Sequence, residues 1–487
     1  MGTAKTVKPA APRTPITMPG MLAALVLLAG GAAVVAVNWP GHWSYDSVVE
    51  LDQGRSGVYN AWHPPVTAWL LGVADRIQRG GALFTVLDGA LVFASLASLA
   101  LMARRGAWGV VAAAVVALAT PQLAIYPAIV WKDVLFAGAA LGAFACLAWY
   151  GRGWPALGSR WAPALRWALV LKAGALLALA ALARQNGLIL IPVAAVTVGW
   201  ITVRREGGRW TRGLGAGAVL LAVAVGVMLA GSAALKRESD GQNERQRQWT
   251  ELRIYEIVAA RRLEPGVADA RLGFPILAAR APAMNAFLTT QGPKLFNTQR
   301  IDPLVQNDTV AAHEDADRPA VLAQWRAIFA ADPGLYLRVR AALFRQVFAA
   351  PDIEACVPLS VGVNGPPEEM NRLGLETRYS DTDDAVFNYA QAMFGTPVFQ
   401  HAAWALLAAL LLIPLLVRRR PEDLAVAGLL AAALTFAATF FAITIACDYR
   451  YLYFLDLSAL AGAVYVAGMV GMAKRGQGGP AENGRPR

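Results

Sequence analysis

Residues 21–37 read MLAALVLLAGGAAVVAV, a run that contains only apolar and small side chains. Two later runs, Ala107–Ala119 and Phe399–Val417, also lack Asp, Glu, Lys and Arg. A helix that crosses the hydrocarbon core of a bilayer needs roughly 20 apolar residues. Several such runs cannot all be core helices of a soluble protein. The sequence therefore predicts an all-α polytopic membrane protein, with the first run retained as a helix and not removed as a signal.

The composition agrees with this fold class. Hydrophobic residues make up 56% of the 487 positions and charged residues only 16%, whereas soluble proteins carry about 25% charged residues. The net charge of +11 does not indicate a nucleic-acid partner, because the positive residues form short clusters between the apolar runs. Such clusters are typical of cytoplasmic loops, which are enriched in Lys and Arg.

Taking the basic clusters as cytoplasmic gives a consistent topology of about ten spans, each near the roughly 20 residues that a span needs. Both tails, 1–17 and 474–487, are then cytoplasmic, in the plasma (inner) membrane. Seven spans occupy 18–235, with a first outer loop at 38–80, and three occupy 397–473. The predicted spans are 18–37, 82–103, 107–125, 134–150, 167–183, 187–203, 213–234, 398–417, 424–445 and 451–472.

The polar segment 236–396 is too long for a loop and is expected to form a mostly helical extracytoplasmic domain. Helices are predicted at Glu244–Arg262, Arg318–Ala331 and Leu335–Phe348. The last of these is amphipathic, and it lies either along the membrane surface or as an ordinary helix of the domain. Cys356 and Cys447 are compatible with a disulfide on an oxidising outer face, but their spacing does not require one.

Polar residues collect beside the spans on the outer side only. Ionisable groups at this depth are costly and are functional candidates. Each also has a structural alternative: a helix cap for an aspartate, snorkelling for a lysine, or local pairing for an arginine, as with Asp448 beside Arg450. The positions concerned are Asp46, Trp62-His63-Pro64-Pro65, Trp131-Lys132-Asp133, Arg184-Gln185-Asn186-Gly187 and Asp448-Tyr449-Arg450-Tyr451.

Other motifs are missing or weak. His313-Glu314-Asp315, with Asp317, lacks a defined metal spacing and is better explained as an exposed acidic loop. The sequence has no P-loop, Gly-x-Ser-x-Gly or His-Glu-x-x-His motif.

Taken together, the outer positions resemble the C-class (GT-C) membrane glycosyltransferases, which include protein O-mannosyltransferases and the lipid A aminoarabinose transferase. The matching places are Ser44-Tyr45-Asp46-Ser47, Trp62-His63-Pro64-Pro65, Trp131-Lys132-Asp133, Arg184-Gln185-Asn186-Gly187 and Asp448-Tyr449-Arg450-Tyr451. The resemblance covers the first six spans best, together with the last hairpin. It implies a sugar donor carried on a polyprenyl phosphate and an extracytoplasmic acceptor, which is a lipid, a polysaccharide or a protein.

The resemblance also implies roles for these residues. Asp46 would be the general base and Asp133 a second catalytic carboxylate, which orients Lys132 or the acceptor. Lys132, Arg184 and Arg450 would bind the donor phosphate, and Tyr45, Trp62 and His63 would contact substrate. No cofactor is required by these roles. A divalent metal ion is compatible with these roles. However, Asp52 follows Asp46 by six residues, and the two do not form the tight acidic pair of a metal site.

Two other classes of protein share some of these features. A transporter or flippase of a lipid-linked or anionic substrate would carry charges or Pro/Gly breaks in mid-span. A non-catalytic protein of envelope assembly would have no reason to gather acids and bases on one face. Membrane lipid is a partner under every alternative.

Overall fold

The computed structural model describes residues 15–59, 63–153, 161–235, 241–264, 274–295, 308–445 and 447–470. Within these ranges the chain is helical and contains three isolated β-bridges but no strand. Eight helices are long and apolar enough to cross a membrane, so the chain is a multi-pass α-helical membrane protein. They are α1 Met18–Val37, α4 Ala82–Ala100, α7 Lys132–Arg152, α8 Ala162–Ala183, η2–α9 Gln185–Arg205, α10 Trp210–Ala234, α19 His401–Arg418 and α20 Pro421–Ile443.

The third predicted span, 107–125, is not one straight helix. It divides into α5 (Gly109–Leu118) and the short pieces α6 (Pro121–Ala124) and η1 (Tyr126–Ala128), and the two halves are bent by 73°. Thr120 has an extended backbone at the break. Pro121 causes the bend, because a residue before proline is driven out of the helical region.

The last predicted span, 451–472, is shorter than expected. A 3₁₀ turn, η5 (Tyr449–Leu452), leads into α21 (Tyr453–Ala467), whose 15 residues fall below the length of the other spans. Helix α21 packs against α4, α5, α7, α19 and α20 and is almost wholly buried. Surrounding helices therefore cover it, and it does not face lipid along its length.

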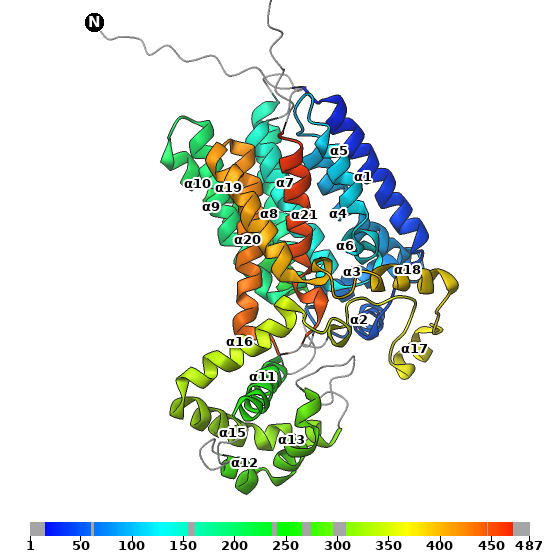
Figure 1. Cartoon of the computed structure of the whole chain (residues 1–487), viewed down its shortest axis with the longest axis vertical. Coiled ribbons are helices and arrows are strands. Elements are labelled where there is room, and N and C mark those ends of the chain that lie inside the picture. Colours follow the sequence, from blue (N-terminus) through cyan, green and yellow to red (C-terminus); the bar gives the residue numbers. More distant parts are fainter. Residues whose placement is uncertain are drawn as a thin grey trace, which may run out of the picture.

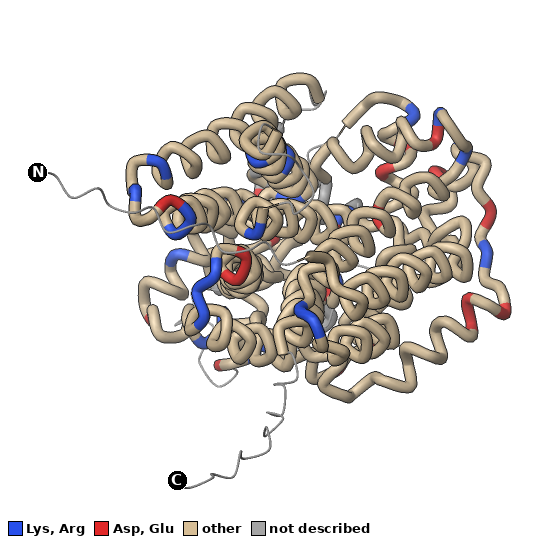
Figure 2. Tube along the Cα trace, turned by 90° about the horizontal axis from the view of Figure 1, so that it is seen from above, with Lys and Arg blue, Asp and Glu red and all other residues tan. Residues whose placement is uncertain are grey.

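Helix α7 is the centre of the bundle. Its most apolar segment of 18 residues is entirely buried, and the helix contacts α4, α8, α20 and α21 (Figure 1). By contrast, less than a third of the corresponding segment is buried in α1, α10 and α19, as expected for helices that face lipid. Seen from one end of the bundle, the helices are mainly free of charge, and the basic segments lie at helix ends and connections (Figure 2).

A separate group of helices packs at the other end of the bundle (Figure 1). We call it the polar domain: α11 (Gly241–Leu263), α12 (Phe274–Arg280), α13 (Pro282–Leu295), α15 (Asp308–Ala331) and α16 (Pro333–Ala349). The predicted helices Glu244–Arg262, Arg318–Ala331 and Leu335–Phe348 are confirmed within α11, α15 and α16. The polar domain has its own apolar core, to which α16 contributes Leu335, Val339 and Leu343.

The helices between the bundle and the polar domain position the site. Helix α2 (Tyr45–Ser56) packs closely on α3 (Pro65–Ile77), where Gly54 and Gly72 meet backbone to backbone. Helices α17 (Pro367–Leu373) and α18 (Asp381–Gln391), with the turns η3 (Glu354–Cys356) and η4 (Pro397–Phe399), complete this layer (Figure 1).

Candidate active site

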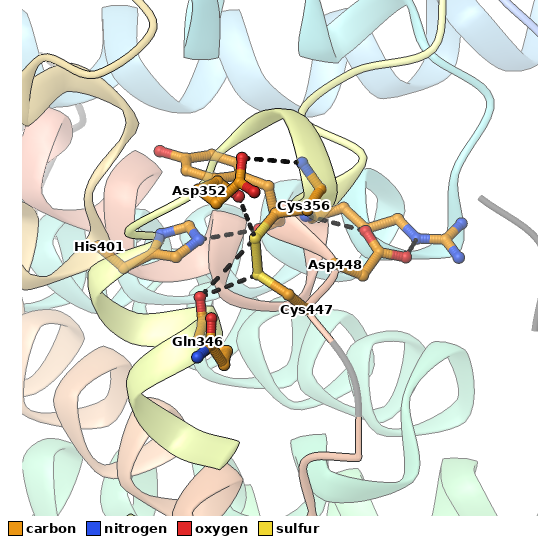
Figure 3. Close-up of a disulfide and its surroundings, with 9 residues drawn as sticks. Gln346, Asp352, Cys356, His401, Cys447 and Asp448 are labelled. Atoms are coloured by element: carbon orange, nitrogen blue, oxygen red, sulfur yellow. Dashed lines mark hydrogen bonds and ion pairs between the residues drawn. A yellow bond between two sulfur atoms is a disulfide. The ribbon is translucent and has the colours of Figure 1, made fainter. Parts of the chain in front are cut away.

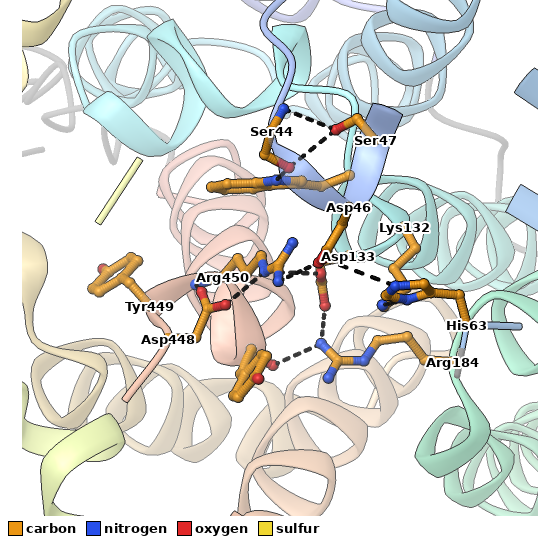
Figure 4. Close-up of polar contacts among 12 residues, drawn as sticks. Ser44, Asp46, Ser47, His63, Lys132, Asp133, Arg184, Asp448, Tyr449 and Arg450 are labelled. Atoms are coloured by element: carbon orange, nitrogen blue, oxygen red, sulfur yellow. Dashed lines mark hydrogen bonds and ion pairs between the residues drawn. The ribbon is translucent and has the colours of Figure 1, made fainter. Parts of the chain in front are cut away.

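Asp46 lies in the first turn of α2, and the start of that helix is fixed to the segment before α7. The hydroxyl of Ser44 accepts a hydrogen bond from the indole N–H of Trp131 (2.9 Å), and the hydroxyl of Ser47 donates to the carbonyl of Val130 (2.6 Å). The Ser44 N–H donates to the Ser47 hydroxyl as in a helix N-cap. The segment before α7 therefore fixes the first turn of α2, which carries Asp46 (Figure 4).

Arg450 comes from η5 and lies among three carboxylates. Its guanidinium is 2.5 Å from Asp46 through Nη2 and 2.8 Å from Asp448 through Nε, with Asp133 3.7 Å away (Figure 4). The Arg450 guanidinium also lies over the Trp131 ring, 5.1 Å from its centroid, where a cation is attracted by the ring face. Asp46 and Arg450, which lie near opposite ends of the sequence, thus contact each other in the structure.

A second arginine lies beside the first. Arg184, at the C-cap of α8, is ion-paired with Asp133 in the first turn of α7. The Arg184 guanidinium also lies 5.3 Å from the ring centroid of Tyr451 and 5.5 Å from that of Phe440. Asp133 is only 1% exposed, so this charge depends on compensation by Arg184 and by the more distant Arg450, because an unpaired buried charge is strongly destabilising.

His63 forms the third part of the site, together with Lys132 and Glu50. The Lys132 ammonium is 2.5 Å from Nδ1 of His63. The two ring nitrogens of His63 each face a carboxylate at 3.8 Å: Nε2 faces Asp46 and Nδ1 faces Glu50. Glu50 follows Asp46 by one helical turn, so both carboxylates lie on the same face of α2.

The surroundings shift the pKa values of these groups in different directions. Burial opposes ionisation of Asp46, but Arg450, with His63 and Lys132, holds its pKa well below the usual range. Burial raises the pKa of Glu50 to about 7 and lowers that of His63 to about 3. Groups with pKa values displaced in opposite directions within one cluster are a mark of functional sites.

Six of the eight predicted site residues are brought together here: Asp46, His63, Lys132, Asp133, Arg184 and Arg450. Trp62 lies outside the described residues. Tyr45 is the first residue of α2, and its side chain is half-exposed. Among the described residues there is no group of three His, Cys, Asp or Glu side chains that suits a metal ion, and the side chains of His313, Glu314 and Asp315 lie outside them.

Glu50 lies in the predicted outer loop 38–80, but the sequence alone assigns it no role, because a loop does not predict that it shares a helix face with Asp46. The spacing of Asp46 and Glu50, four residues apart, was the available signal. Two acidic residues within the predicted spans, Asp88 and Asp456, were also missed, and both are fully buried. Asp456 accepts hydrogen bonds from the Tyr449 hydroxyl (2.7 Å) and pairs with Nδ1 of His401 (2.7 Å), so it supports the turn that carries Arg450.

Comparison with known proteins gives a weak likeness. No family model matches the chain, and no curated protein matches it. Among solved structures, the chain is similar to two of the Archaeoglobus fulgidus oligosaccharyltransferase, with 91% of this chain covered in both. The first is tethered to an acceptor peptide; its sequence identity is 13%, the TM-score is 0.39, and the match covers 49% of that chain. The second is AglB in complex with an inhibitory peptide and a dolichol-phosphate; its sequence identity is 14%, the TM-score is 0.41, and the match covers 50% of that chain. The chain thus spans about half the length of these structures, and at such TM-scores the likeness by itself assigns no activity.

Proposed function

We propose that this protein is an integral membrane glycosyltransferase that moves a sugar from a polyprenyl-phosphate carrier to an extracytoplasmic acceptor. The observation that carries the proposal is the cluster of Asp46, Lys132, Asp133, Arg184 and Arg450 at one end of the spans. A lipid-borne phosphate arrives at this depth, where water is scarce and charge interactions are strong. Fixed arginines suit it, because the guanidinium fork donates parallel hydrogen bonds to phosphate oxygens.

The transfer step uses Asp46 as the general base. An acceptor O–H or N–H attacks the anomeric carbon, and its proton passes to the Asp46 carboxylate. The bond between the anomeric carbon and the phosphate oxygen breaks, and the phosphate keeps the electron pair. Lys132, Arg184 and Arg450 meet the charge that develops on the leaving phosphate, while Asp133 orients Arg184 through their ion pair.

The ion pair between Arg450 and Asp46 supports an order for this step. Arg450 contacts Asp46 at 2.5 Å, and that contact makes Asp46 a poor base, because it stabilises the carboxylate. A donor phosphate competes for the same guanidinium. When Arg450 turns toward the phosphate, Asp46 loses its partner and its basicity rises. The base is therefore competent only when the donor is bound.

The experiment is a turnover assay on the purified protein in lipid nanodiscs, with a panel of polyprenyl-phosphate sugars. Wild type is compared with Asp46→Asn and with Asp52→Asn, which makes the same change on the same helix at a carboxylate paired with Arg372. Transfer or donor hydrolysis in wild type and in the Asp52 variant, with loss in Asp46→Asn, supports the proposal. Full activity in Asp46→Asn would remove Asp46 as the base.

One observation favours transport as a second candidate. Asp88 lies in α4, is fully buried, and both of its carboxylate oxygens lack a hydrogen-bond partner among the described residues. A buried acid within a span is typical of ion and proton pathways. However, Asp88 is the seventh of the 19 residues of α4 and lies on the half of that helix nearer the cluster. Flux of a lipid-linked sugar across proteoliposomes, without transfer or hydrolysis, would favour transport.

A further inference from the structure

The turn that carries Arg450 is held at two places, by α16 of the polar domain and by η3, the turn that follows α16. The chain leaves α20 at Thr444, continues through Cys447 and Asp448, and enters η5. From the bundle side, His401 holds this turn, because its Nε2 lies 2.9 Å from the Tyr449 carbonyl. The fastenings on the other side come from α16 and from η3, which immediately follows it along the chain.

The first fastening is Arg340 of α16. This arginine is fully buried, and its guanidinium donates to the carbonyls of Phe441 (2.7 Å) and Thr444 (2.9 Å). The last carbonyls of a helix have no partner within the helix, and a cation there also complements the helix dipole. Arg340 is therefore the cap of α20, although it belongs to another domain.

Glu256 fixes the orientation of Arg340. Its carboxylate lies 3.0 Å from Nη1 of Arg340, and it also accepts a hydrogen bond from the Trp325 indole. Glu256 comes from α11 and Trp325 from α15, so three helices of the polar domain converge on the end of α20. A pair as deeply buried as this one is costly unless both partners are held in place, and the apolar core of the domain supplies that support.

The second fastening is the disulfide between Cys356 and Cys447 (Figure 3). Cys356 belongs to η3, just after α16, and Cys447 is the residue before Asp448. The carbonyl oxygen of Gln346, in α16, lies 2.9 Å from the Cys447 sulfur and 3.7 Å from that of Cys356. The covalent link thus ends one residue from a carboxylate that contacts Arg450 at 2.8 Å.

We infer that α16 of the polar domain, with the η3 turn that follows it, positions the phosphate-binding arginine of the active site, through Arg340 at the end of α20 and the Cys356–Cys447 disulfide beside Asp448. Arg340 is a positioning residue in this arrangement, since it touches neither Asp46 nor Arg450. A molecule that binds the polar domain and shifts α16 would move the turn 447–452 and change donor affinity. The inference rests on the proposed function for its kinetic part only.

The test compares Arg340→Met with Arg340→Lys and with Arg338→Met. Arg338 is the matched control, because it lies two residues away on α16 but is exposed and pairs with Glu264 and Asp332. Backbone amide hydrogen exchange of residues 447–455 is measured in nanodiscs, together with KM and kcat for the polyprenyl-phosphate sugar. We expect faster exchange and a KM raised about tenfold in Arg340→Met, a typical size for coupling between sites.

The lysine variant should recover part of the donor affinity, and the Arg338 variant should behave as wild type. In Arg340→Met, kcat should change less than KM. A Cys356→Ser/Cys447→Ser variant, and wild type treated with a membrane-permeant phosphine reductant, should show the same faster exchange at 447–455. These two also serve if Arg340→Met does not fold.

Exchange unchanged at 447–455 in both the arginine and the cysteine variants would overturn the inference. So would faster exchange with an unaltered KM in an active enzyme. If wild type neither binds nor turns over any polyprenyl-phosphate sugar, the proposed function fails, but the exchange data still decide whether the polar domain holds this turn.

Discussion

Replacing Glu50 with glutamine tests the electrostatics of the site directly. The Glu50 side chain is 1% exposed, and its Oε1 has no hydrogen-bond partner among the described residues. Burial raises the pKa of Glu50 from 4.5 to about 7; Lys132 opposes this shift, and the Asp46 charge reinforces it. Glutamine has almost the same shape as the protonated acid, so Glu50→Gln removes the titration and leaves the packing in place.

The sign and size of the effect follow from linkage. The folded protein keeps the Glu50 proton up to about pH 7, whereas the unfolded chain releases it near 4.5. The free energy of unfolding therefore falls as pH rises through this window. At about 1.4 kcal/mol per pKa unit, the loss is about 3 kcal/mol. Glu50→Gln does not undergo this loss. Between pH 4.5 and pH 8 the free energy of unfolding of the variant therefore rises by about 3 kcal/mol relative to that of wild type.

The assay is reversible unfolding in mixed detergent micelles at several pH values across this window. The quantity of interest is the difference in unfolding free energy between the variant and wild type, because other groups titrate equally in both. Asp52→Asn is the control, since its carboxylate is paired with Arg372 at the surface. Parallel pH curves for wild type and Glu50→Gln would refute the reasoning and show that Glu50 is ionised in the folded protein.

Three further outcomes are expected. Asp46→Asn should lower transfer about 10²- to 10⁴-fold, the usual contribution of a general base, while binding of polyprenyl phosphate, measured by lipid pull-down, survives. Arg184→Met should weaken that binding more than Arg184→Lys does, and it should also lower thermal stability, because Asp133 is left buried without its partner. Burial lowers the pKa of His63 to about 3, so His63 is neutral at working pH. His63→Gln should therefore leave the pH dependence of turnover unchanged between about pH 5 and pH 8. If turnover of wild type falls toward pH 5 and that of the variant does not, this expectation is wrong.

The spans could be predicted because charge-free runs and basic clusters are local properties of the sequence. Even so, the bend after α5 was missed, although Pro121 marks it. Apolar periodicity does not show whether a proline kinks a span or ends it. The short final helix was missed for a related reason, since α21 is covered by other helices and does not need the length of a lipid-facing span.

The site could be predicted in part because sidedness is a strong constraint. Asp46, Lys132, Asp133, Arg184 and Arg450 all follow or precede spans at the same predicted face, and they do meet in the structure. Their pairing could not be predicted, because contacts between residues hundreds of positions apart depend on how the helices pack. Buried acids such as Asp88 are hidden by their apolar neighbours, and a search for charge clusters passes over them.

The pairing resolves a conflict in the predicted topology, which places these basic residues on the outer face, where basic residues are disfavoured. Lys132, Arg184 and Arg450 bring three positive charges. The carboxylates of Asp46, Asp133 and Asp448 contact the two arginines, and the Lys132 ammonium contacts His63.

With Glu50 protonated, the cluster is close to neutral, which lowers the cost of burying it. The same balance sets a requirement for any anionic ligand. A phosphate that enters must displace a carboxylate from an arginine, and the displaced carboxylate becomes more basic. A protein that only needed neutrality would be served equally well by apolar residues, so the retained charges are best explained by a substrate that exchanges with them.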